Sequence, residues 1–129
     1  MKPCEIIKDI FIIGGPDITD SRDGCVYLID MGELVLIDSG AGWSVDKIIN
    51  NIKELGLDPQ KLGMILLTHC HIDHIGGAPD IRKRYGSKLC IHELDAPPLE
   101  KGDPILTAAN FARSSLNRRR NWKTRWLGR

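Results

Sequence analysis

Residues 68–77 read THCHIDHIGG, and they place three of the chain's four histidines and one aspartate within six positions. The apolar run at residues 64–67 precedes them and is typical of a buried strand. Imidazole and carboxylate groups together suit a first-row divalent metal ion. The alternative is a polar loop with incidental histidines, but it does not explain why three of only four histidines gather at one strand end. We therefore interpret this stretch as a metal site.

The spacing of the donors indicates how metal ions would be held. His69 and His71 lie two positions apart on a chain leaving a strand, so both rings can converge on one ion. Asp73 and His74 lie further along and can reach a second ion nearby. Two ions about 3.5–4 Å apart can share a bridging hydroxide, which is an arrangement used for metal-assisted hydrolysis.

The length of 129 residues predicts a single domain, and apolar periodicity predicts its strands and helices. Strands are expected at residues 10–13, 25–29, 34–37, 64–67 and 88–91, and helices at residues 45–55, 79–85 and 104–116, with a turn-rich segment at 93–100. The strand–helix–strand order predicts right-handed parallel crossovers. Ligand sites in such sheets gather at the carboxyl ends of the strands. His92 should emerge at that edge as a pocket or structural residue.

Charge is divided unevenly along the 129 residues. Residues 104–129 hold seven Lys/Arg, no acidic residue and two of the three tryptophans. We expect residues 114–129 to be disordered or not native to the fold, as a frameshift would make them. The alternative is a basic tail that binds nucleic acid through phosphate contacts and stacking. No apolar run is long enough to cross a bilayer, and the first residues do not look like a signal peptide, so we expect a cytoplasmic protein.

Two motifs carry a resemblance to a known family. Residues 68–77 resemble the THxHxDHxGG signature of the metallo-β-lactamase superfamily, and residues 38–40, Asp-Ser-Gly, resemble that family's earlier strand-Asp-x-Gly motif. The likeness runs from about residue 5 to about residue 112. Within the family, the chain most resembles the thioesterase-type members related to hydroxyacylglutathione hydrolase. It implies an α/β fold, the αββα sandwich, of which residues 1–113 would form only the amino-terminal half, a mixed sheet with helices.

The resemblance also implies roles for particular residues. His69, His71, Asp73 and His74 would be metal ligands, with Asp73 also a proton shuttle, and Asp38 would support the ligands. The position of Cys70 is variable in the family pattern, so that residue would be a neighbour of the ligands. The cofactor would be Zn²⁺ in a two-metal site, with iron or manganese as alternatives. A metal-bound hydroxide would attack the carbonyl of a small-molecule thioester, ester or lactam.

The family pattern is incomplete in this chain. The family draws a further histidine, a bridging aspartate and a last histidine from later segments, but here no histidine follows His92 and no acidic residue follows Asp103. We therefore expect a chain truncated or frame-shifted after about residue 113, weakly active or inactive alone, with an exposed sheet face open to self-association. The rival function is a non-catalytic or nuclease-related protein that binds nucleic acid through its basic end.

Overall fold

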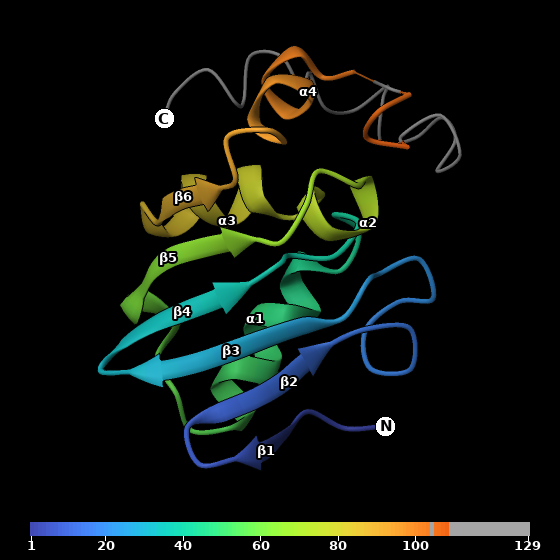
Figure 1. Cartoon of the computed structure of the whole chain (residues 1–129). Coiled ribbons are helices and arrows are strands. Elements are labelled where there is room, and N and C mark those ends of the chain that lie inside the picture. The colour runs from blue at the N-terminus through green and yellow to red at the C-terminus, as the bar shows by residue number, and fades with distance from the viewer. Residues whose placement is uncertain (104, 109–129) are drawn as a thin grey trace.

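A computed structural model of the chain describes residues 1–103 and 105–108. Six strands form one sheet in the order β1-β2-β3-β4-β5-β6 (Figure 1). The strands are β1 (Cys4–Ile7), β2 (Ile10–Gly14), β3 (Val26–Met31), β4 (Glu33–Ile37), β5 (Leu62–Leu67) and β6 (Lys88–Ile91). Strands β1 to β4 pair antiparallel, whereas β4, β5 and β6 pair parallel. The sheet is therefore mixed, which confirms the predicted α/β class.

The crossovers between the parallel strands contain all the described helices except the last, which follows β6. The helices are α1 (Val45–Glu54), the short 3₁₀ helix η1 (Pro59–Lys61), α2 (Ile72–Ile75), α3 (Ala78–Tyr85) and α4 (Ala96–Lys101). Two successive right-handed crossovers that move along the sheet in one direction place their helices on one face. Helices α1 and α3 accordingly lie behind the same face of the sheet in Figure 1.

The core lies between that face and the two helices. One row of side chains crosses four strands in register, because Phe11 pairs with Leu28, Leu28 with Leu36 and Leu36 with Ile65. These four residues are buried, and they join the apolar stripe of α1 in one cluster. The next row, Ile12, Tyr27, Ile37 and Leu66, points to the opposite face and is only half-buried. The alternation shows that one face of the sheet carries the core of the described chain.

Some sequence expectations were wrong in detail. Residues 96–101, expected to be irregular, form α4, because its two prolines fall in the first helical turn, where a missing N–H costs nothing. Residues 105–108 form a turn, although a helix was expected from residue 104. The rest of that helix, the predicted boundary at residues 113/114 and the basic segment 114–129 lie outside the described residues. In the described part, no helix has both the length and the apolar character to span a membrane.

Candidate metal centre

The candidate ligands lie where β5 ends and α2 begins. His69 leaves the carboxyl end of β5, and Asp73 and His74 stand on the single turn of α2. One donor atom from each of these three half-buried residues lies within 4.8 Å of the other two. The rings of His69 and His74 have centroids 4.3 Å apart. Two imidazoles and a carboxylate thus converge at the strand edge that the crossover argument predicts.

His71 lies beside this group. Its exposed side chain meets the ring of His69 edge-on, with 4.8 Å between the centroids. The structure thus brings His69 together with Asp73 and His74, and it sets His71 on the solvent side of His69. How the four donors would be shared between two ions stays a prediction.

Two other residues singled out in the sequence lie apart from the donor group. Cys70 is buried, and its thiol donates to the carbonyl of Leu106 at 3.6 Å. Burial raises the pKa of this thiol above its ordinary value. His92 is exposed, and its Nδ1 accepts a hydrogen bond from the amide of Leu94 at 3.1 Å. His92 therefore stabilises a turn.

Asp38 orients the donors from the end of β4. Its carboxylate is buried and accepts hydrogen bonds from the amide of Thr68 at 2.8 Å, from the Thr68 hydroxyl at 2.7 Å and from Nδ1 of His74 at 2.9 Å. Its backbone has φ 63°, in the left-handed region. Aspartate visits that region more readily than most residues, and such conformations cluster at functional sites. From this position the carboxylate of Asp38 reaches Thr68 at the end of the neighbouring strand β5.

These hydrogen bonds fix which ring nitrogens are free. An ionised carboxylate only accepts, so the hydroxyl of Thr68 must donate to Asp38 and accept from Nδ1 of His69, which lies 2.8 Å away. Nδ1 of His74 likewise donates to Asp38. Both rings therefore carry a proton on Nδ1 and leave Nε2 available as a ligand. A carboxylate that holds a histidine in this way is the usual partner of a metal-binding imidazole.

The same contacts set the protonation of the two rings. Burial lowers the pKa of His69 below its ordinary value, and the neighbouring rings of His74 and His71 lower it further. The hydrogen bond to Asp38 raises the pKa of His74, although burial opposes it. The lowered pKa favours the neutral form of His69 that binds a cation, whereas the raised pKa of His74 means that a proton competes more strongly with a cation for its Nε2.

Glycines let two loops close around α2. A Cβ added to Gly24, in the β2–β3 loop, would lie 2.5 Å from Cε1 of His74, and the Gly24 amide donates to the carbonyl of Asp73 at 2.9 Å. A Cβ on Gly76 would lie 2.1 Å from the backbone carbonyl of Ala41. The backbone of Ser39 donates to the carbonyl of His74 at 2.8 Å. The backbone of the β2–β3 loop at Gly24 and that of the β4–α1 loop at Ser39 and Ala41 therefore pack against α2. We call these two loops the walls of the site.

Sequence reasoning missed several of these groups. The sequence motif assigns no role to Thr68, and the loop position of Gly24 assigns none to that glycine. A glycine's need for space depends on what packs against it, and the partner of Gly24 lies 50 positions away, so no local signal marks it. Asp38 was found because it ends a strand in a recognisable motif.

The donor set fits a divalent metal ion. Two neutral-capable imidazoles with free Nε2 atoms and an accessible carboxylate match the ligands that zinc takes. Nε2 of His74 lies 3.5 Å from the Asp73 carboxylate, whose side chain is 45% exposed. An exposed carboxylate next to a ring nitrogen gives a cation an entry from solvent. The residues present are therefore chemically suited to bind one.

Comparisons with known proteins identify relatives of this chain. The sequence profile of the metallo-beta-lactamase superfamily matches residues 22–125. The probable metallo-hydrolase YflN of Bacillus subtilis is 36% identical over 76 residues, which cover 56% of this chain and 29% of that protein. The probable polyketide biosynthesis zinc-dependent hydrolase BaeB of Bacillus velezensis is 34% identical over 65 residues, covering 50% of this chain and 28% of that protein.

A solved structure shares the fold. The class B3 di-zinc metallo-beta-lactamase LRA-12 from an Alaskan soil metagenome superimposes with a TM-score of 0.71 and 32% identity. The match covers 79% of this chain and 37% of that one. The chain thus spans well under half the length of the relatives that it matches.

Proposed function

The chain belongs to the metallo-beta-lactamase superfamily, and on that premise we propose that it is the metal-binding part of a hydrolase. Its ligands are His69, His71, Asp73 and His74, and Asp38 holds His74 in place. The substrate class is a small-molecule ester, thioester or lactam. Zinc is the proposed metal, since a similar protein is described as zinc-dependent and a similar structure as di-zinc.

One observation carries the proposal: donor atoms of His69, Asp73 and His74 lie within 4.8 Å of one another, with Nδ1 of both rings already engaged by hydrogen bonds. When bound, a divalent metal ion lowers the pKa of water and polarises a carbonyl. The chain's own residues orient the ligands. The exposed carboxylate of Asp73 can also accept a proton from the solvent side, which supports its proposed second role as a proton shuttle.

We also propose that this chain alone hydrolyses substrates weakly or not at all. A catalytic zinc ion usually takes three protein ligands and keeps one open position. The motif offers four donors for two ions, and no histidine follows His92. Metal binding and turnover should therefore separate in this chain, with zinc bound and little hydrolysis.

Zinc binding by the 129-residue chain is the first test. Competition with a chromogenic chelator should show bound zinc, and His69→Ala and His74→Ala should each lower the affinity at least about tenfold, as loss of a metal-site partner does. His92→Ala is the matched control, because that histidine lies outside the donor group. Unchanged zinc affinity in both ligand variants would refute the site. Rapid hydrolysis of ester, thioester or lactam reporters by the zinc-loaded chain, abolished by a chelator, would refute the proposal of weak activity.

A further inference from the structure

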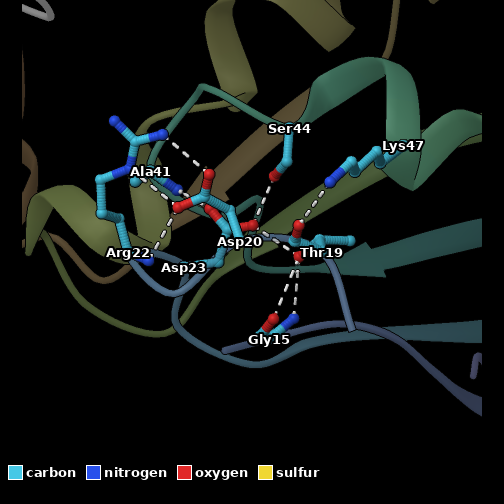
Figure 2. Close-up of polar contacts among 8 residues, drawn as sticks. All are labelled: Gly15, Thr19, Asp20, Arg22, Asp23, Ala41, Ser44 and Lys47. Carbon is cyan, nitrogen blue, oxygen red and sulfur yellow. Dashed lines mark hydrogen bonds and ion pairs between the residues drawn. The ribbon is translucent and has the colours of Figure 1, made fainter. Parts of the chain in front are cut away.

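Asp23 is a buried carboxylate that the proposed chemistry does not use. It lies in the β2–β3 loop and is 3% exposed. Figure 2 shows three donors around it: the hydroxyl of Thr19 at 2.5 Å, the hydroxyl of Ser44 and the amide of Ala41 at 2.8 Å. A buried carboxylate needs hydrogen-bond donors, and Asp23 receives one from its own loop and two from the β4–α1 loop.

The three donors come from two loops, and two further contacts help to join the same parts of the chain: Arg22 lies over the ring of Trp43, and Lys47 of α1 donates to the carbonyl of Thr19. Thr19 is in the same loop as Asp23, Ala41 is in the β4–α1 loop, and Ser44 precedes the first residue of α1. Ser44 occupies the N-cap position but makes no side-chain capping bond, because its hydroxyl donates to Asp23. A Cβ on Gly40 would lie 2.7 Å from the Asp23 carboxylate. Asp23 thus fastens the β2–β3 loop to the β4–α1 loop.

Those two loops are the walls of the candidate metal centre. Gly24 follows Asp23 directly, supports the ring of His74 and donates to the carbonyl of Asp73. Ala41, which donates to Asp23, packs its backbone against Gly76 on the other side of α2. Asp23 therefore links both walls by hydrogen bonds without touching a ligand.

We propose that Asp23 is a positioning residue for the metal ligands Asp73 and His74, acting through Gly24 and Ala41. The inference rests on the proposed function, because it concerns the same site. Asp23 is thus proposed to set the orientation of the ligands, and it is not proposed as a further ligand. What the position needs is a planar group that bonds to both loops, whatever its charge.

Two substitutions at the same position test this. Asp23→Ala removes all three hydrogen bonds, and the affinity for zinc should fall about tenfold, the lower end for residues that support ligands indirectly. Asp23→Asn should restore affinity to within about threefold of the parent. In Asp23→Asn, the new side-chain oxygen still accepts from the amide of Ala41, and the new NH₂ group can donate to the hydroxyls of Ser44 and Thr19. The Thr19 hydroxyl can then donate to the carbonyl of Gly15, 3.2 Å away.

The controls separate positioning from loss of stability. Ile52→Val, in the buried stripe of α1, should destabilise the fold without changing zinc affinity. Asp20→Asn alters a half-buried carboxylate in the same loop, where it pairs with Arg22, and should also leave the affinity unchanged. The absorption spectrum of bound Co²⁺ reports ligand geometry, and it should change in Asp23→Ala but not in either control.

The outcomes are distinct. If the unaltered chain binds no zinc or cobalt, the proposed function fails. If the unaltered chain binds zinc and Asp23→Ala matches it in affinity and Co²⁺ spectrum, the role of Asp23 is refuted and the metal site stands. An equal loss of affinity in Asp23→Ala and Ile52→Val would also overturn the positioning role. If Asp23→Ala does not fold, Ser44→Ala, which removes one donor, is judged by the same criteria.

Discussion

Replacing Gly24 by alanine tests the closeness of the wall to the ligands. The added Cβ would lie 2.5 Å from Cε1, 2.6 Å from Nε2 and 2.9 Å from Nδ1 of His74. Carbon atoms rest at about 3.5–4.0 Å, so the ring must retreat by roughly 1 Å, which breaks its 2.9 Å bond to Asp38. Overpacking costs about 1–3 kcal/mol and a hydrogen bond to a charged group about 1.5–3 kcal/mol. We expect the free energy of unfolding to fall by about 3–5 kcal/mol.

Chemical denaturation and zinc competition measure both consequences of Gly24→Ala. Zinc affinity should fall at least about tenfold, since His74 loses its orienting partner. Gly32→Ala is the matched control: its φ of 86° strains an alanine, but no atom lies within 4 Å of the added Cβ. That strain costs about 1–2 kcal/mol and leaves the site alone. The reasoning is refuted if the two variants lose equal stability and bind zinc equally well.

Three further results are expected. Asp38→Asn should shift the His74 proton from Nδ1 to Nε2, seen in ¹⁵N spectra of the ring, and should lower zinc affinity about 10–100-fold; an unchanged tautomer would contradict this. In the metal-free chain, the pKa that NMR measures for His74 should lie above 6.5, and the pKa measured for His69 should lie below 6.5. His74 therefore stabilises the fold below pH 6.5, and this contribution is lost as the pH rises through its raised pKa. Arg22 lowers the pKa of Asp20 to about 2. This surface ion pair should contribute at most about 1 kcal/mol to the free energy of unfolding, fully present above pH 3.8 and lost as the pH falls through about 2. Denaturation curves of the parent and Asp20→Asn should therefore differ slightly at pH 7 and converge near pH 2.

Much of the fold could be predicted because apolar periodicity is local. The strand at residues 34–37 and the helix at residues 45–55 match β4 and α1 to within one residue at each end. β1 was missed, because its four residues are all exposed and so carry no pattern of burial. α4 was missed because two adjacent prolines suggest a turn unless their place in the helix is known.

The candidate site was less predictable than the fold. The donors are visible in the sequence because a motif gathers them within six positions, and Asp38 because it ends a strand. Asp23 and Gly24 act through contacts with Ala41 and His74, which lie 18 and 50 positions away. Such contacts appear only when two loops meet in space, and no periodicity or motif encodes them.

The donors are neighbours in sequence, and this limits how far a metal can stabilise the fold. Bringing His69, Asp73 and His74 together closes no long loop, so an unfolded chain loses little entropy when it chelates an ion. An ion stabilises the native state only to the extent that it prefers that state. The increase in melting temperature on adding zinc should therefore come mainly from the orienting contacts made by earlier parts of the chain, and a short peptide of residues 68–77 would compete for the same ion.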